Sequence, residues 1–325
     1  MKFLVIGLGS MGKRRIRCLK ALNYTEIVGY DVRFDRRSEA EKLYGLQTVD
    51  SLSNFDLSAM DAFIISVPPA LHLEFLKLAV EHNRPAFVEA SVVLDGLEEI
   101  NRLAVLKEVL IAPSCTLRFH PAIKDIKRIV QSGMYGKFTN FSYHSGQYLP
   151  DWHPWEKVTD YYVSQKDTGG GREIVPFELT WLIDILGYPE NVAGFYGKTM
   201  DVGANIDDTY VLSLKFRQGF GIFLVDVVSR YAMRSLVLNL ELAQIVWRWD
   251  EATVNVYEAN NQRWIAYKQK EASAHPGYNK NIIEDMYVEE LSSFANALKG
   301  KEKFPSTLAD DIEVLKVLYR IENRL

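Results

Sequence analysis

Three glycines within the first dozen residues constrain the fold of this chain more than any other feature. Gly7, Gly9 and Gly12 form the pattern G-x-G-x-x-G, directly after the apolar run Lys2–Ile6 and before a basic amphipathic segment. The apolar run predicts a short buried strand, and the segment after the glycines predicts a helix. In such a strand–turn–helix unit, the first glycine permits the tight turn and the second lets a ligand approach the backbone. The third lets the helix pack closely on the sheet.

This pattern indicates a dinucleotide-binding site, with the phosphates at the helix N-terminus, where unpaired N–H groups favour anions. A second predicted strand, Glu26–Tyr30, ends at Asp31, about 20 residues beyond the last glycine, where an acidic residue accepts bonds from ribose hydroxyls. We therefore expect NAD as the cofactor, because Asp31 would repel the 2′-phosphate of NADP. Arg33, Arg36 or Arg37 could instead receive that phosphate. The alternative is a glycine turn in an unrelated α/β domain.

Length, charge and cysteine content narrow the class of protein. A chain of 325 residues suggests two domains, and 48% hydrophobic with 25% charged residues is normal for a soluble globular protein. The net charge of −4 gives no electrostatic case for nucleic acid or a membrane surface. We interpret the basic run Lys13–Arg15 as a solvated helix face. Two cysteines, Cys18 and Cys115, fit a reducing cytoplasm.

Strand-like and helix-like segments alternate as far as residue 117, which predicts a doubly wound parallel sheet. Asp31, Pro68, Glu89 and Cys115 fall at the carboxyl ends of its strands, where such sheets bind ligands. Beyond residue 118 the chain reads as an α+β domain. We expect a Rossmann domain over residues 1–117 and, over 118–325, a domain with a large, mostly antiparallel open sheet.

The predicted antiparallel sheet carries more large side chains than one buried face requires. They are Phe223, Trp247, Trp249, Val254 and Trp264. We expect the exposed face of the sheet to form a homo-oligomer interface, unless helices of the same chain cover these side chains.

Several segments together resemble the glucose-fructose oxidoreductase / inositol dehydrogenase family, written Gfo/Idh/MocA. They are the glycine pattern with Asp31, Val67-Pro68 followed by His72, Arg118–Pro121 and Glu290–Phe294. The resemblance implies a Rossmann domain, a mixed α/β domain and hydride exchange between a nicotinamide and a sugar or cyclitol. It also implies a set of cofactor-binding residues: Gly7, Gly9, Ser10, Met11, Gly12, Asp31, Val67, Pro68, His72 and Glu89.

The segment Gly146–Glu156 resembles a branch of the family associated with cell-surface polysaccharide pathways. Trp152 and Trp155 offer flat faces on which a sugar can stack, and His153 offers a partner for a hydroxyl. We expect these three residues and Arg118 to bind the substrate. The alternative is a structural lid whose tryptophans cover apolar surface. Asp151, His153 and Glu156 could ligate a metal, but no second cluster supports such a site, so we expect none.

The chain departs from the family at its acid–base residues. The family usually has Glu-Lys-Pro where this chain has Glu89-Ala90-Ser91, so the catalytic lysine is missing. After the glycine run, Val175 takes the position of the family's aspartate, and Glu178 falls at or beside that of its histidine. A new proton-transfer set could consist of Glu178, Glu173, Arg172 and His153. Alternatively, Arg172 and Glu178 form a structural ion pair, and Glu173 only complements the helix dipole.

These features predict a cytoplasmic NAD-dependent oxidoreductase acting on a sugar or nucleotide-sugar. Glu178 is the first candidate for the general base, because it lies nearest the position of the family's histidine, and His153 is the second. Two alternatives stay open at this point. Tightly bound NAD could support chemistry without net oxidation, or the protein could bind cofactor and sugar without catalysis.

Overall fold

The chain forms two compact units. The computed structural model describes residues 1–154, 156–269 and 283–325. The first unit comprises Met1–Cys115 and Tyr287–Glu313, and the second comprises Thr116–Met286 and Val314–Leu325. The sequence prediction had assigned everything beyond residue 117 to the second domain. The structure returns residues 287–313 to the first, where Glu290 pairs with the buried Arg15.

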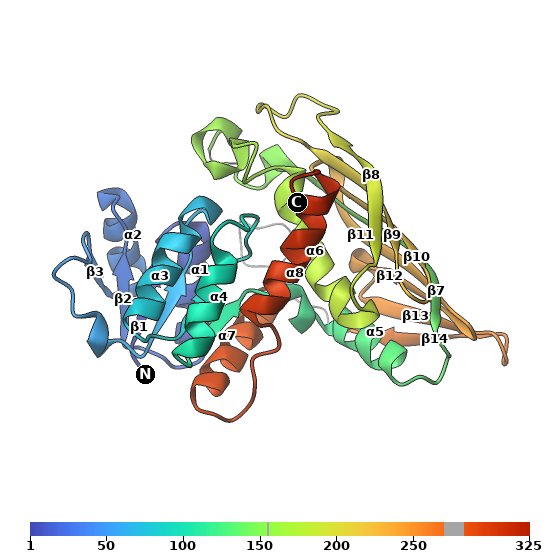
Figure 1. Ribbon diagram of the computed structural model, residues 1–325, viewed down its shortest axis with the longest axis horizontal. Helices are drawn as coiled ribbons and strands as arrows, with labels where there is room; N and C mark the ends of the chain where they lie inside the picture. Colours follow the sequence, from blue (N-terminus) through green and yellow to red (C-terminus); the bar gives the residue numbers. More distant parts are fainter. Residues whose placement is uncertain (155, 270–282) are drawn as a thin grey trace. The chain divides into compact units, whose positions relative to one another are not determined.

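The first unit is built on a six-stranded parallel sheet with the strand order β3-β2-β1-β4-β5-β6 (Figure 1). This is the order of a dinucleotide-binding Rossmann sheet, as the sequence predicted. The central strand has no exposed side chain, as expected of a parallel sheet covered on both faces. The strands are β1 (Phe3–Ile6), β2 (Ile27–Tyr30), β3 (Gln47–Val49), β4 (Ala62–Ile65), β5 (Ala86–Val88) and β6 (Ile111–Pro113). The helices are α1 (Ser10–Ala21), α2 (Phe34–Tyr44), α3 (His72–Glu81), α4 (Leu97–Leu106) and most of α7 (Glu284–Leu298).

The second unit is built on an eight-stranded sheet with the order β14-β13-β12-β11-β7-β10-β9-β8. All neighbouring strands are antiparallel except β7 and β10, so the predicted mostly antiparallel sheet is confirmed. The strands are β7 (Phe138–Tyr148), β8 (Asn191–Gly197), β9 (Thr209–Lys215), β10 (Phe220–Asp226), β11 (Val228–Leu240), β12 (Ala243–Arg248), β13 (Thr253–Glu258) and β14 (Arg263–Lys268). The helices are α5 (Pro121–Gln131), α6 (Gly171–Leu186) and the last part of α8 (Leu308–Ile321).

Helices α5 and α6 cover one face of this sheet (Figure 1). Phe223, Trp247 and Val254, which the sequence placed on an exposed face, are at most 1% exposed. Trp247 packs edge-on against Trp181 of α6, with ring centroids 6.2 Å apart. The prediction was wrong for these three residues, because strand alternation shows which side chains share a face but not which face the helices cover. Trp264 is exposed.

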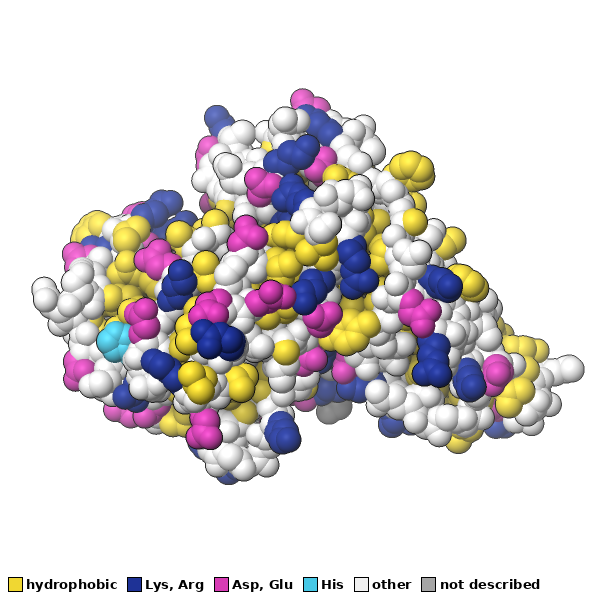
Figure 2. Space-filling model, in the orientation of Figure 1, with side chains coloured by type: hydrophobic (Ala, Val, Ile, Leu, Met, Phe, Trp, Pro, Cys, Tyr) yellow, Lys and Arg dark blue, Asp and Glu magenta, His cyan; other side chains and the backbone are white. Residues whose placement is uncertain are grey.

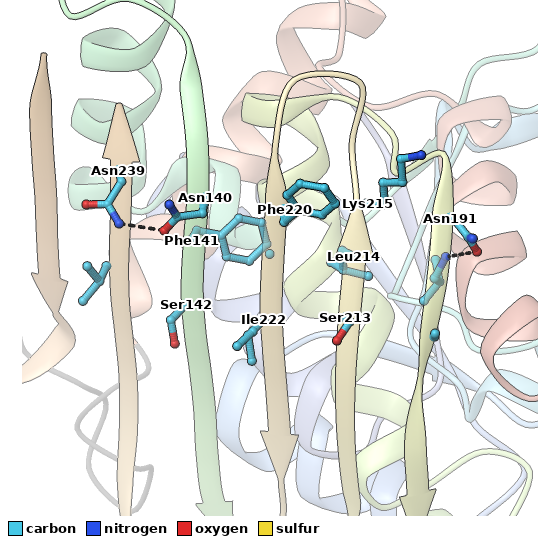
Figure 3. Close-up of a pocket in the computed structure, with 14 residues that line it drawn as sticks. Asn140, Phe141, Ser142, Asn191, Ser213, Leu214, Lys215, Phe220, Ile222 and Asn239 are labelled. Atoms are coloured by element: carbon cyan, nitrogen blue, oxygen red, sulfur yellow. Dashed lines mark hydrogen bonds between the residues drawn. The ribbon is translucent and has the colours of Figure 1, made fainter. Parts of the chain in front are cut away.

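The other face of the sheet carries no helix among the described residues, and its composition differs from the prediction. Phe220 and Ile222 of β10 are 64% and 56% exposed. Across the sheet, Ile222 lies opposite Ser213 on one neighbouring strand and Ser142 on the other. Together these small and apolar side chains line a shallow depression of about 590 Å³ (Figure 3).

The charged side chains on one face of the molecule are mixed in sign. On the face shown in Figure 2, Lys and Arg side chains are interspersed with Asp and Glu rather than gathered into a patch of one sign. In the described parts of the chain, none of the helices combines the length and hydrophobicity that crossing a membrane requires.

Candidate active site

Two of the three glycines are required by the packing of the first unit. Gly7 has φ +91°, and a Cβ there would lie 2.6 Å from the carbonyl oxygen of Ser66. A Cβ on Gly12 would overlap the carbonyl oxygen of Gly7, so only glycine allows α1 to lie this close to the turn. The predicted roles of these glycines in the turn and in helix packing therefore agree with the geometry.

The middle glycine opens the turn toward a ligand. A Cβ on Gly9 would meet no atom nearer than Nη1 of Arg36, at 3.6 Å. Gly9 is also the N-cap of α1, whose first residues are Ser10 and Met11, and no side chain caps this end of the helix. The first turn contains no acidic residue. A bare backbone at a helix N-terminus fits the pyrophosphate of a dinucleotide.

Asp31 follows β2 and braces the glycine turn. Its side chain is 5% exposed, and its carboxylate accepts hydrogen bonds from the backbone N–H groups of Leu8, at 2.8 Å, and Arg33, at 2.9 Å. An ionised carboxylate can accept about four hydrogen bonds, so it retains capacity for ribose hydroxyls. Arg36 lies 3.6 Å from the same carboxylate. This environment fits the predicted role of Asp31 toward the adenosine ribose of NAD.

His72 fixes the turn after β4. Burial lowers the pKa of His72 to about 4, so its ring is neutral at physiological pH. Nε2 therefore carries the proton and donates to the carbonyl oxygen of Val67, at 2.9 Å. The predicted group Val67, Pro68 and His72 is thus one locally bonded turn, in which His72 positions the backbone. Direct contact of these residues with the cofactor stays a prediction.

The basic run Lys13–Arg15 on α1 is not the solvated helix face that the sequence predicted. Arg14 and Arg15 are 2% and 0% exposed, not solvated. Arg15 binds both oxygens of Glu89, at 2.6 and 2.7 Å, and its third nitrogen donates to Glu290, at 2.7 Å. Burial acts to lower the pKa of Arg15, but the two carboxylates outweigh it and hold that pKa well above its usual value. Glu89, a predicted cofactor contact, is therefore bound by Arg15 from within the first unit.

Ala90 and Ser91, which follow β5 and Glu89, supply no proton-transfer group in place of the missing lysine. Ala90 has no polar side chain, and the hydroxyl of Ser91 exchanges hydrogen bonds with the backbone of Val93, at 3.2 and 3.3 Å. The remaining candidates for the acid–base residue lie on α6 and on the loop before it, in the second unit.

Glu178, the first candidate for the base, is fully buried between α6 and the sheet. Its Oε1 accepts hydrogen bonds from Ser145, at 2.9 Å, and Arg234, at 2.8 Å. Its Oε2 accepts from Tyr143, at 2.6 Å, and Trp181, at 3.1 Å. Burial, followed by the charge of Glu178, raises the pKa of Tyr143 well above its usual value, so the phenol remains a donor. Four donors satisfy this carboxylate, so the geometry favours a structural role, and its role as a base stays a prediction.

Arg172 and Arg118 also make contacts that hold the fold together. Arg172, 1% exposed, forms a double hydrogen bond to Glu322, at 2.8 and 3.0 Å, and donates to the carbonyl oxygen of Asp167. The ion pairs are therefore Arg172 with Glu322 and Glu178 with Arg234, rather than Arg172 with Glu178. Arg118 donates to the carbonyl oxygen of Thr180 on α6, at 3.2 Å. Roles of the two arginines in catalysis or substrate binding stay predictions.

Glu173 has a different environment, although it lies on the same helix. Its Oε1 accepts a hydrogen bond from the phenol of Tyr162, at 2.6 Å. Its Oε2 is buried and has no hydrogen-bond partner among the residues that the structure describes. Burial raises the pKa of Glu173 to about 7, and the bond from Tyr162 acts in the opposite direction. A carboxyl group with this pKa can both accept and donate a proton near neutrality.

The loop between β7 and α6, residues 149–170, is called the aromatic loop below. In it, three rings contact one another in sequence. His153 stacks on Tyr161, with centroids 4.7 Å apart, and Tyr161 meets the edge of Tyr162 at 6.2 Å. The indole N–H of Trp152 is buried without a hydrogen-bond partner in the described part of the chain. Trp155, a predicted substrate contact, lies outside the described residues. Tyr161 and Tyr162 were missed by the sequence analysis, because both lie beyond the segment Gly146–Glu156 that drew attention to this loop.

The described residues contain no cluster of His, Cys, Asp and Glu side chains that could hold a metal ion. NAD, in contrast, matches the site: the bare backbone at Gly9, the open start of α1 and the remaining capacity of Asp31 lie together in the first unit. Fold and site together define a Rossmann-type, dinucleotide-binding protein with a second α+β domain.

The family model described as "Oxidoreductase family, NAD-binding Rossmann fold" (GFO_IDH_MocA) matches residues 1–110. These residues therefore form the NAD-binding domain of that oxidoreductase family, and the resemblance drawn from the sequence is confirmed. NAD is the cofactor, and the enzyme class is that of NAD-binding oxidoreductases. A comparison with curated protein sequences gives no match.

Solved structures share the fold over the whole chain. An oxidoreductase from Agrobacterium radiobacter, in complex with NAD⁺, L-tartaric acid and magnesium, has a TM-score of 0.84 at 12% identity, covering 100% of this chain and 96% of its own. Levoglucosan dehydrogenase, in complex with NADH and levoglucosan, has a TM-score of 0.83 at 16% identity, with 100% and 96% covered. UDP-N-acetylglucosamine 3-dehydrogenase from Acidithiobacillus ferrooxidans has a TM-score of 0.79 at 15% identity, with 100% and 97% covered.

Proposed function

We propose that this protein oxidises a hydroxyl-bearing carbon of a sugar or nucleotide-sugar with NAD⁺. The observation that carries the proposal is the intact glycine turn with Asp31, in a domain that matches an NAD-binding oxidoreductase family. Support for the substrate class comes from the aromatic loop of the second unit and from two proteins of the same fold. By name, one of these is a levoglucosan dehydrogenase and the other a UDP-N-acetylglucosamine dehydrogenase.

In this proposal the residues of the first unit bind and orient the cofactor. The turn at Gly9 and the N-terminus of α1 hold the pyrophosphate, and Asp31 holds the adenosine ribose. Bound NAD⁺ supplies a hydride acceptor. In the second unit, the indole N–H of Trp152 would donate to a sugar hydroxyl, and the neighbouring rings would cover the apolar face of the sugar. A role in cell-surface polysaccharide biosynthesis in the cytoplasm rests on the resemblance of residues 146–156 to that branch of the family.

A panel of sugars tests the proposal. The purified protein is mixed with NAD⁺ and with levoglucosan, inositol, free hexoses or UDP-N-acetylglucosamine, and NADH formation is followed by absorbance. We expect NADH from at least one of them and none from Gly12→Ala, whose added methyl group closes the turn. Conversion of a sugar without net NADH would support non-redox chemistry instead. NAD binding without conversion of any compound would support a silent binding protein.

The protein is also proposed to form a homo-oligomer through the helix-free face of its eight-stranded sheet. Phe220 and Ile222 are exposed there beside the small side chains of Ser142 and Ser213. Large apolar side chains exposed on an uncovered sheet face are uncommon on monomers and suit a second copy of the same sheet.

A further inference from the structure

We propose that Glu173 and Tyr162 form the acid–base pair of the reaction, with Glu173 as the group that exchanges the proton of the substrate hydroxyl. The inference rests on the proposed function, an NAD⁺-dependent oxidation of a sugar carbon. It is carried by geometry: one oxygen of Glu173 is bound by the Tyr162 phenol at 2.6 Å, and the other is buried with no partner among the described residues. A buried oxygen without a partner is costly, and sites of function are where such costs are tolerated.

The contrast with Glu178 supports this assignment. Both glutamates lie on α6, but Glu178 faces the sheet and accepts four hydrogen bonds. Glu173 faces the aromatic loop and accepts one hydrogen bond among the described residues, from Tyr162. One of its oxygens therefore keeps lone pairs with which to receive a proton. A charge that only complemented the helix dipole would be expected at the surface, in water, rather than with a buried oxygen.

The backbone around Tyr162 holds the pair in place. Tyr162 begins the short 3₁₀ helix η6 (Tyr162–Ser164). Gly169 follows so closely that a Cβ there would overlap the carbonyl oxygen of Val163, and its N–H donates to Gln165, at 2.9 Å. The glycine run thus brings the start of α6 against η6, and this contact sets Tyr162 against Glu173. A fixed partner of this kind is expected of a catalytic carboxylate.

The groups around Glu173 set its protonation. Burial raises the pKa of Glu173 to about 7, and the Tyr162 hydroxyl is the group that lowers it. Tyr161 lies beside Tyr162, and its own pKa is raised by burial, then by Glu156 and Glu173. The adjacent Arg172 is bound to Glu322 and to the Asp167 carbonyl. Glu173 can therefore change its protonation state near neutral pH.

In the proposed step the carbinol carbon of the substrate is oxidised to a carbonyl carbon. The C–H bond of the carbinol breaks and its electron pair leaves with the hydride, which reduces NAD⁺ to NADH. The O–H bond breaks, its proton moves to the carboxylate of Glu173, and a C=O bond forms. In the reverse direction, protonated Glu173 returns the proton to the carbonyl oxygen. Oxidation thus requires ionised Glu173, and reduction requires the protonated form.

The first test measures the protonation of Glu173 in the purified full-length protein without substrate. Difference infrared spectroscopy across pH 5–9 should show a carboxyl group that titrates near pH 7 in the parent. This signal should be absent in Glu173→Gln and retained in Glu190→Gln, which removes an exposed carboxylate of the same unit. A signal that persists unchanged in Glu173→Gln would overturn the assignment.

The second test uses the sugar that the parent oxidises. Glu173→Gln should bind NAD⁺ with unchanged affinity by calorimetry and lower kcat for oxidation by at least ~100-fold, with loss of the acidic limb of its pH profile. Tyr162→Phe removes a bond that favours the ionised carboxylate, so it should move that limb to higher pH. A purely structural role would not move it. Formate should partly restore the rate of Glu173→Ala.

The outcomes separate the two proposals. If the parent forms NADH and Glu173→Gln does so at a similar rate, the Glu173 assignment is wrong and the proposed function stands. If Glu173→Gln is slow but keeps the pH profile of the parent, Glu173 is structural and the assignment is also wrong. If the parent converts no sugar of the panel, the proposed function fails and the assignment fails with it.

Discussion

The substitution Glu178→Gln separates a structural carboxylate from a catalytic one. Each oxygen of Glu178 accepts one hydrogen bond from a group that can only donate: Oε1 from Arg234 and Oε2 from Trp181. A glutamine has one oxygen and one NH₂ group, so in either orientation its NH₂ group faces one of these donors. Ser145 and Tyr143 can rotate their hydroxyls to compensate, but a guanidinium and an indole cannot accept.

The stability that Glu178→Gln is expected to lose follows from the burial of the ion pair between Glu178 and Arg234. Glu178 is 0% exposed and the Arg234 side chain 6% exposed, so the substitution removes the carboxylate charge of a buried ion pair. Breaking a buried ion pair in this way costs about 3–5 kcal/mol. With about 2–4 °C of melting temperature lost per kcal/mol in a domain of 150–250 residues, the second unit should melt roughly 10 °C lower.

Thermal and urea unfolding followed by circular dichroism measure this cost. The matched control is Glu178→Gln with Arg234→Met, in which the glutamine no longer faces a guanidinium, so we expect the double variant to recover more than about 1 kcal/mol. A single variant that melts within about 1 °C of the parent would refute the argument from burial. If that stable variant also loses turnover by ~100-fold, Glu178 is the base that the sequence first suggested.

Three further perturbations test the cofactor site, the sheet surface and the charge on α6. Asp31→Ala should weaken NAD binding by roughly 1–3 kcal/mol, the worth of hydrogen bonds to a charged acceptor. The parent should bind NAD more tightly than NADP in the same calorimetric titrations, and a preference for NADP would contradict the assignment of Asp31. Ile222→Glu places a charge on the helix-free sheet face and should convert an oligomer into a monomer by light scattering. A parent that is itself a monomer of 37.2 kDa would contradict the interface. Glu173→Gln should stabilise the fold above pH 7, because a carboxyl whose native pKa is raised from 4.5 to about 7 costs stability as pH rises through that window. The gain, by melting at pH 8 relative to pH 5, is up to about 3 kcal/mol, and equal melting shifts at both pH values would show that Glu173 is not buried as described.

The architecture could be predicted because its determinants are local in the sequence. The strand β1 is an apolar run, the glycines follow it at fixed spacing, and Asp31 ends the next strand. In the second unit, half-buried and buried side chains alternate along strands such as β13 (Thr253–Glu258), and this period-two pattern is what predicts an antiparallel sheet. The hydrophobic pattern and the turn residues are enough to predict such strands, because each strand is determined mainly by residues close to it in the sequence.

Long-range pairings could not be predicted from the same patterns. Arg15 and Glu290 are 275 positions apart, and no local signal joins them. Without that partner, an arginine on an amphipathic helix is indistinguishable from a solvated one, which is why the basic run was misread. Residues 287–313 were assigned to the second domain for the same reason, because no local signal links them to the first unit.

The two glutamates of α6 show the same limit within one helix. Glu173 and Glu178 are five positions apart, so at about 100° per residue their side chains point roughly 140° away from one another. One must therefore face away from whatever the other packs against, and the sequence does not say which faces the sheet. Alignment to the family favoured Glu178 because of its position. The contacts reverse that order: Tyr143 and Arg234 from the sheet occupy Glu178, whereas Glu173 keeps a buried oxygen without a described partner. Position along the helix located both carboxylates, but only their surroundings distinguish the one that is free to take a proton.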